Sequence, residues 1–126
     1  MSIYFVILFM LFCHVLDDYT LQGWLASGKQ KSFWKENAPD ALYKYDYIMA
    51  LIMHSISWSF MIMLPLAIYL AFEITLPFVI IFFANVLVHA VVDDLKANRK
   101  VINLIIDQSV HLIQIFTTAA LVLYCL

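Results

Sequence analysis

The chain has 126 residues, of which 65% are hydrophobic and 13% are charged, and its formal net charge is −2. A soluble domain of this length could not bury so much apolar surface. The chain also lacks the strong positive charge that nucleic-acid-binding proteins carry, so we expect no nucleic acid as a partner. Composition therefore predicts a single integral membrane domain, residues 1–126, whose main partner is the lipid bilayer.

Four stretches of the sequence are long and apolar enough to cross the hydrocarbon core, which takes about 20 residues. They are residues 3–24, 47–71, 75–95 and 101–125. The sequence thus predicts an all-α integral membrane bundle of four transmembrane helices, with a loop at about 25–46. Asp40 is the expected N-cap of the second span, and Pro65 is expected to kink that span.

The basic residues are confined to two connecting segments, and they predict the orientation of the bundle. They are Lys29, Lys31, Lys35 and Lys44 in the first connection, and Lys96, Arg99 and Lys100 in the last. The positive-inside rule places both connections in the cytoplasm and both termini outside. We interpret the four lysines of the first connection as determinants of topology, with contact to anionic lipid as a lesser role.

Ionisable side chains within the spans point to a buried site, because each costs a few kcal/mol to insert. They are His14, Asp17, Asp18, His54, His89, Asp93, Asp94, Asp107 and His111. Three spans repeat one spacing, a histidine and an aspartate four residues apart, which places both groups on one helical face. At about 1.5 Å per residue, all of these side chains fall in the cytoplasmic half of the bilayer.

So many carboxylates gathered at one depth need a counterion, and Lys96 is the one obvious cation near them in the sequence. A divalent metal ion would supply the missing charge. Histidine and aspartate together suit zinc, manganese or iron, and we expect zinc or manganese. The expected ligands are the three repeated pairs, His14 and Asp18, His89 and Asp93, and Asp107 and His111.

Each of the remaining ionisable groups has more than one candidate role. Asp17 and Asp94 each adjoin an inward-facing aspartate and can point to headgroups or water, although Asp94 is also a candidate catalytic group. His54 is the lone histidine of its span and is a candidate proton carrier, a structural donor or a ligand. Lys96 either reaches to the membrane interface or holds a substrate phosphate.

In chain order the motifs are His14-Val-Leu-Asp17-Asp18-Tyr-Thr-Leu-Gln22, His54, His89-Ala-Val-Val-Asp93-Asp94-Leu-Lys96 and Asp107-Gln108-Ser-Val-His111. Together they resemble a family of short bacterial and phage membrane proteins catalogued as a domain of unknown function. This resemblance covers nearly the whole chain and implies a multi-pass protein of the bacterial inner membrane, of a kind often encoded by phages or prophages. The motifs are more distantly similar to those of small inner-membrane proteins described as metal-dependent hydrolases. From that similarity, the positions assigned most firmly to the site are Asp18, His89, Asp93, Asp107 and His111.

The sequence leaves three functions open. The first is a metal-dependent hydrolase at the cytoplasmic face, acting on a phosphoester of a lipid headgroup or polyprenyl carrier. The second is a proton or metal-ion conduit, although the nearly apolar outer halves of the spans argue against a pore within one chain. The third is a non-catalytic phage or bacterial protein that binds a host membrane component and whose polar core only holds the fold. A homo-oligomer is expected if a second subunit is needed to seal the site.

Overall fold

The computed structural model describes all 126 residues, and it contains helices and no strands. The elements are α1 (Ile3–Leu16), the π-helix η1 (Asp17–Leu21), α2 (Leu25–Gly28), α3 (Lys31–Asn37), the 3-10 helix η2 (Ala41–Tyr43), α4 (Asp46–Tyr69), α5 (Leu76–Ala97) and α6 (Leu104–Cys125). The stretches long and apolar enough to cross a membrane are Ile3–Leu21, Ala41–Tyr69, Leu76–Ala97 and Leu104–Cys125. The prediction of an all-α chain with four helices long and apolar enough to cross a membrane is confirmed.

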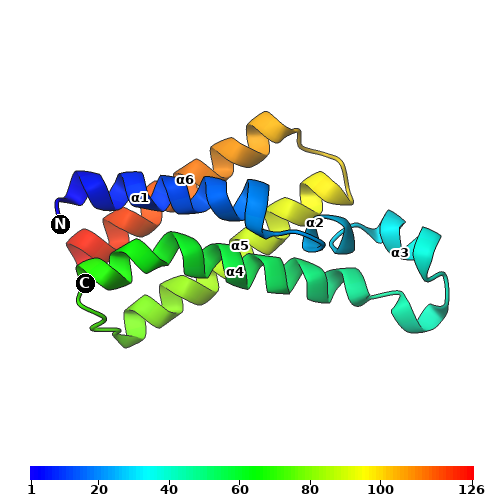
Figure 1. The fold of residues 1–126 in the computed structure, drawn as a ribbon, viewed down its shortest axis with the longest axis horizontal. Coiled ribbons are helices and arrows are strands. Elements are labelled where there is room, and N and C mark those ends of the chain that lie inside the picture. The colour runs from blue at the N-terminus through cyan, green and yellow to red at the C-terminus, as the bar shows by residue number, and fades with distance from the viewer.

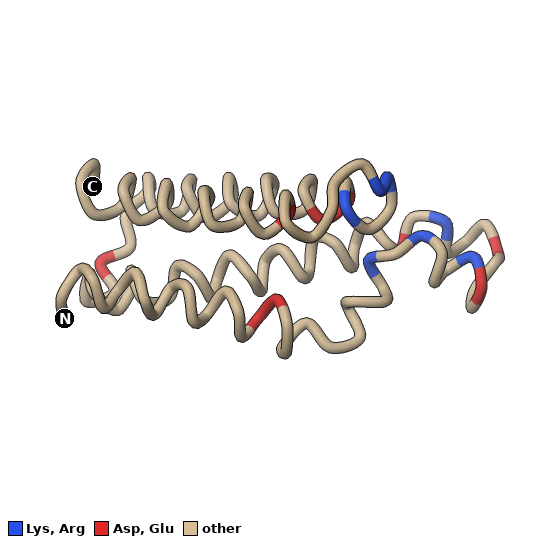
Figure 2. Tube along the Cα trace, turned by 90° about the horizontal axis from the view of Figure 1, so that it is seen from above, with Lys and Arg blue, Asp and Glu red and all other residues tan.

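The four long helices form an antiparallel bundle (Figure 1). Both chain termini and the turn at residues 70–75 lie at one end, which we call the terminal end. Residues 22–45 and the connection at residues 98–103 lie at the other end, which we call the basic end. Figure 2 shows that the lysine and arginine residues gather at the basic end. Charged residues of both signs are therefore concentrated toward the basic end, and Glu73 is the one acidic residue at the terminal end.

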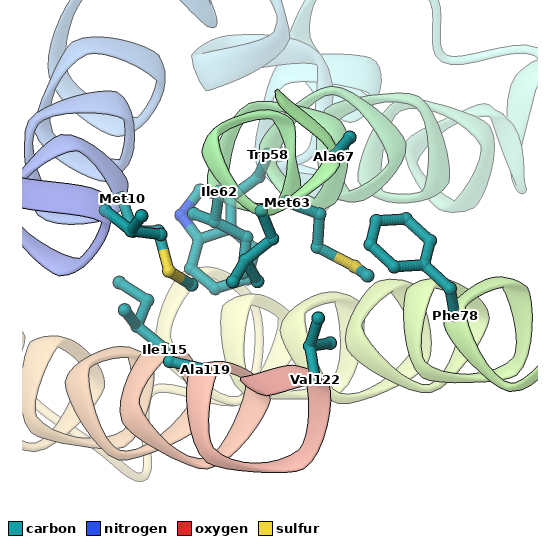
Figure 3. Close-up of a cluster of buried hydrophobic side chains, with 11 residues drawn as sticks. Met10, Trp58, Ile62, Met63, Ala67, Phe78, Ile115, Ala119 and Val122 are labelled. Atoms are coloured by element: carbon teal, nitrogen blue, oxygen red, sulfur yellow. The ribbon is translucent and has the colours of Figure 1, made fainter. Parts of the chain in front are cut away.

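The half of the bundle nearer the terminal end has an apolar core. Its members come from α1, α4, α5 and α6 and include Val6, Met10, Trp58, Ile62, Leu66, Phe78, Ile115, Ala119 and Val122 (Figure 3). The outer surface of the bundle is apolar as well, and Tyr4 and Ile105 are 82% and 76% exposed. Because lipid is as apolar as these side chains, close packing between helices holds this half together.

The first span ends in a π-turn. Backbone N–H of Gln22 donates to the carbonyl of Asp17 at 3.1 Å, a bond between residues five apart. Gly23 follows with φ of +52°, a left-handed conformation that costs glycine little and other residues more. A π-turn of this kind often marks a functional site, because it changes which side chains face inward.

The helix boundaries correct two details of the sequence analysis. Asp40 precedes η2, and the second span's helix begins only at Asp46, so Asp40 is not the N-cap of that helix. The last span begins at Leu104 rather than at residue 101, because the Asn103 side chain accepts a hydrogen bond from Ile106 N–H and caps the helix there. Pro65 lies inside α4, which continues past it to Tyr69.

The predicted loop at residues 25–46 contains short helices that cover part of the basic end. Indole Nε1–H of Trp34 donates to the carbonyl of Gly28 at 2.7 Å and holds α3 against α2. Asn98, just after α5, donates to the carbonyl of Lys29 at 3.0 Å and accepts from the backbone N–H of Lys31 at 2.8 Å. One amide side chain thus ties the segment to the end of the third span.

The antiparallel arrangement predicts which residues share a side of the membrane. After Cys125 is replaced by serine, single cysteines at Ser2 and Glu73 should react with a membrane-impermeant maleimide from one side. Single cysteines at Lys35 and Lys100 should react only from the other side, since they lie at the opposite end of the bundle. The native Cys13 is buried and serves as the unlabelled background. Labelling of Glu73→Cys and Lys35→Cys from the same side would contradict the fold.

Candidate metal centre

Three imidazoles and three carboxylates meet between the spans, on the basic-end side of the apolar core. They are Asp18 from η1, His54 from α4, His89 and Asp93 from α5, and Asp107 and His111 from α6. Asp18 is 6% exposed and the other five are fully buried. Four spans therefore bring ionisable groups from distant parts of the chain into one enclosed cluster, which we call the centre.

The six residues form three overlapping groups of possible metal ligands. They are Asp18 with His54 and His89, His89 with Asp93 and His111, and Asp18 with Asp107 and His111. Within each group one atom from every residue lies within 4.8 Å of the others. Because the groups share Asp18, His89 and His111, they form a single connected centre rather than separate sites.

Each outer carboxylate oxygen of the centre is held by a hydrogen-bond donor. Nζ of Lys29 donates to Oδ2 of Asp93 at 2.6 Å, and Nζ of Lys96 donates to Oδ2 of Asp107 at 2.6 Å. The amide Nε2 of Gln108 donates to Asp107 Oδ2 and to Oδ2 of Asp18, both at 2.9 Å. Such partners fix the orientation of a ligand, as outer groups do around metals in proteins.

The inner oxygens have no such partner. Asp93 Oδ1 and Asp107 Oδ1 lie 3.5 Å and 3.4 Å from Nε2 of His111, beyond a good hydrogen bond. All three atoms are buried, and none of them has a hydrogen-bond partner. Leaving a buried polar atom unpaired costs about 1–3 kcal/mol. A cation shared by these three atoms would satisfy all of them.

His54 faces the same cluster from α4. Its Nε2 lies 3.1 Å from Nε2 of His89, 3.4 Å from Oδ1 of Asp18 and 3.4 Å from Oδ2 of Asp93. At this distance the two rings can form one hydrogen bond, in which the Nε2–H of one ring donates to the Nε2 of the other. His54 is thus part of the centre, although its helix offers no matching aspartate.

Asp17 lies behind His54 and is fully buried, which corrects the expectation that it points to headgroups or water. Its Oδ1 accepts a hydrogen bond from Ser57 Oγ at 2.6 Å, and its Oδ2 lies 3.8 Å from Nδ1 of His54. In a regular α-helix, neighbouring side chains point in different directions, whereas the π-turn lets Asp17 and Asp18 both face inward.

His14 lies beside the centre but outside the ligand groups. Its Nδ1 accepts a hydrogen bond from Nε1–H of Trp58 at 2.8 Å, so its Nε2 carries the proton. That Nε2 lies 3.0 Å from the amide oxygen of Gln108. Both ring nitrogens are therefore engaged, and the structure gives His14 the role of orienting Gln108, which in turn holds Asp18.

The side of the centre that faces the apolar core is closed by aromatic stacking. The Trp58 ring stacks on His89 at 4.1 Å between centroids, and His89 stacks on His111 at 4.3 Å. Trp58 also belongs to the apolar core shown in Figure 3. Sequence reasoning did not single it out, because a tryptophan in an apolar span carries no sign of a polar partner.

Asp94, the other candidate catalytic residue, lies away from the centre. Its carboxylate accepts from Nδ2 of Asn98 at 2.8 Å and from Nε of Arg99 at 3.2 Å. It follows Asp93 on a regular helix, so the two side chains point in different directions. Asp94 stabilises the end of α5, and the structure offers it no contact with the six residues of the centre.

Lys29 is the most important residue that sequence reasoning missed. It was interpreted as a topology determinant, yet its side chain is buried against Asp93, and Lys29 is only 6% exposed. The Gly28 just before it lies close against the Trp24 ring, where a Cβ would come within 2.8 Å. Lys29 and Asp93 are 64 residues apart in the sequence, so analysis of local patterns cannot predict that they pair.

When the carboxylates are taken as ionised and the imidazoles as neutral, the formal charges around the centre do not balance within the protein. Four buried carboxylates, Asp17, Asp18, Asp93 and Asp107, face two ammonium groups, Lys29 and Lys96. With neutral imidazoles, two negative charges remain. Burial of uncompensated charge is costly, and one divalent cation would supply the missing charge.

The buried ion pair predicts unequal effects for two neighbouring lysines. Lys29→Met should lower the free energy of unfolding by about 3–5 kcal/mol, because it leaves Asp93 buried without its ammonium partner. Lys31→Met, at an exposed residue in no ion pair, should change it by at most about 1 kcal/mol, the usual size of an exposed cation–π contact such as the one Lys31 makes with the Tyr47 ring. Denaturant titration in mixed micelles with a chelator present would measure both. Equal stability of the two variants would contradict a structural role for the ion pair.

Comparison of the chain with protein-family models, curated proteins and solved structures finds no match. The resemblance to short bacterial and phage membrane proteins stays a prediction, and the function is inferred from the centre itself.

Proposed function

We propose that this protein is a membrane-embedded, metal-dependent hydrolase that acts on a phosphoester of a lipid headgroup or polyprenyl carrier. The centre would hold one divalent ion, zinc or manganese. The observation that carries the proposal is the group of three unpaired buried atoms, Nε2 of His111 with the inner oxygens of Asp93 and Asp107. A polar core that served only to hold the helices together would be expected to satisfy its buried atoms.

The donor set supports the choice of metal. Imidazole nitrogen and carboxylate oxygen together suit zinc and manganese, whereas magnesium favours oxygen alone. His89, Asp93 and His111 would be the principal ligands, with Asp18 and Asp107 completing the set. All candidate ligands come from one chain, so this centre needs no second subunit to assemble.

A bound divalent ion would supply Lewis acidity toward a phosphoryl oxygen and an activated water as nucleophile. His54 is the proposed proton carrier. Its Nε2 faces the centre, and its Nδ1 lies 3.8 Å from Oδ2 of Asp17, so a small shortening of this distance would let the carboxylate orient the ring as in a catalytic histidine. Ser57 holds Asp17 in place. The Asp17 and His54 side chains would thus move a proton, while Lys29 and Lys96 keep the ligand carboxylates ionised.

The charge distribution supports an orientation. All seven basic residues lie at or beside the basic end, and the positive-inside rule would place that end in the cytoplasm of a bacterial cell. Both termini would then be external, and the centre would lie in the cytoplasmic half of the inner membrane. A lipid-linked phosphoester in the inner leaflet would approach the centre from the basic end.

Substrate entry would require movement at the basic end, because the ligands are buried in this state. Lys29 follows α2 directly and reaches inward to Asp93. The short segment between Gly23 and Lys29 is the proposed gate, since release of the Lys29 ion pair would uncover the side of the centre nearest to the headgroups.

A conduit is less well supported. Proton or ion transfer across the membrane needs polar groups along the whole path. Between the centre and the terminal end lies the apolar core, where Met10, Ile62, Leu66 and Ile115 are fully buried. The buried amides in that half, Asn85 and Gln114, bond to each other at 2.8 Å and join α5 to α6.

Metal content tests the centre directly. Wild-type protein purified in detergent and reconstituted with zinc or manganese should retain about one ion per chain, as one divalent charge balances the buried carboxylates. Asp107→Ala with His111→Ala should abolish retention, whereas His14→Ala should keep it, because His14 is outside the ligand groups. Inductively coupled plasma mass spectrometry would measure the content, with helicity checked by circular dichroism. An ion-free wild type, or full retention by the folded double variant, would overturn the proposal.

Activity tests the role of His54. Phosphate release from phospholipids and polyprenyl phosphates in mixed micelles should depend on the metal and stop with a chelator. His54→Ala should keep the metal yet lower kcat by about 10²–10⁴-fold, the usual contribution of a general acid or base. Asp94→Asn is the matched control and should leave activity within about twofold, since a surface change away from the site has little effect. Equal losses in both variants would rule out the assigned role.

A further inference from the structure

A cavity of about 400 Å³ lies at the basic end, between α3, η2 and the beginning of α4. Its walls contain the lysines Lys31, Lys35 and Lys44, and aromatic residues that include Trp34 and Tyr47. None of these residues belongs to the metal centre. Ammonium groups in a cavity can bind an anion, and aromatic rings beside them can contact an apolar group of the same ligand.

The three lysines keep their charge available. Of the seven basic residues, Lys29, Lys96 and Arg99 form ion pairs with aspartates. Three of the four that remain line this cavity, and Lys100 is the fourth. Asp40 is the one carboxylate in the wall, and it lies within 4.0 Å of none of the lysine ammonium groups. The cavity therefore has a net positive lining.

Aromatic rings position two of the ammonium groups without neutralising them. Nζ of Lys31 lies 4.8 Å from the centroid of the Tyr47 ring, and Nζ of Lys44 lies 5.3 Å from that of Tyr45. Trp34 and Tyr43 stack with 6.3 Å between centroids and an interplanar angle of 15°. Cation–π contacts restrict the lysines while leaving their N–H donors free for an anion.

The cavity lies where the protein meets the lipid headgroups. The apolar run of the second span begins in the first turn of α4, just after Asp46, and Tyr47 in that turn lines the cavity, so the cavity lies at the edge of the expected hydrocarbon core. Leu42 is 80% exposed and Tyr45 is 64% exposed, as expected for side chains in contact with acyl chains and the interface. A ligand here would have a charged group in the cavity and an apolar part alongside α4.

We propose that this cavity is a binding site for the phosphate headgroup of an anionic phospholipid. The bound lipid would hold α3 at the membrane surface. The proposal stands on the cavity, its unpaired lysines and its position at the interface, and it does not depend on the hydrolase activity or on metal binding.

Native mass spectrometry of the full chain, released from detergent with added phosphatidylglycerol or phosphatidylcholine, tests this site. Wild-type protein should retain phosphatidylglycerol in preference to phosphatidylcholine. Each lysine removed should weaken retention by about fivefold, so Lys31→Gln with Lys35→Gln and Lys44→Gln should remove the preference. Lys100→Gln is the matched control and should retain the wild-type preference. Undiminished retention in the triple variant, or an equal loss with Lys100→Gln, would overturn the proposal.

A second variant distinguishes loss of the cavity from misfolding or reversed topology, either of which could lower lipid retention in the triple variant. Ala41→Trp fills the cavity at an exposed residue and leaves every lysine in place. It should reduce phosphatidylglycerol retention while metal content stays at the wild-type level, which separates this site from the centre. Retention at the wild-type level in Ala41→Trp would overturn the assignment to the cavity. Displacement of the lipid by an equal concentration of glycerol 1-phosphate would show a site for free phosphate esters and would overturn the lipid assignment.

Discussion

The need to neutralise buried carboxylates governs the basic half of this molecule. An ionised carboxylate loses several kcal/mol of hydration when it enters a membrane protein interior, and it regains that energy only from well-placed partners. Asp93 and Asp107 each bond to a lysine at 2.6 Å. The lysine bound to Asp93 follows α2, so that bond also draws the connecting segment over the end of the bundle. Local structure at the basic end thus follows from charge compensation.

The same constraint explains why the two halves of the bundle differ. Toward the terminal end the helices meet through apolar packing and a small polar group in which Asn85 bonds to Gln114 and Thr118. Toward the basic end they meet through carboxylates whose outer oxygens are bonded and whose inner oxygens are not. Trp58 marks the boundary, with its ring stacked on His89 and its N–H bonded to His14. An arrangement that orients ligands and leaves their inner atoms free is what a metal centre requires.

The sequence predicts the spans and much of the centre because those features obey local rules. A span needs about 20 apolar residues, and helical period alone brings His89 and Asp93 to one inward face. The features it does not predict depend on distant partners or on irregular backbone. The π-turn brings Asp17 inward, Trp58 and Gln108 occupy both nitrogens of His14, and Lys29 meets its carboxylate across 64 residues. Spacing within one helix contains none of this information.

The segment at residues 22–45 contributes residues to both the metal centre and the lipid cavity. Lys29 points inward to the centre, while Lys31, two residues later, lines the cavity at the interface. Asn98 fixes the backbone of both lysines to the end of α5. If an anionic lipid holds α3 at the membrane surface, the centre can open only by movement of the short stretch before it, where Gly23 already adopts a left-handed conformation. The lysine that closes the centre and the lysines that face the lipid would then act from one segment, so headgroup binding would set the position from which the gate opens.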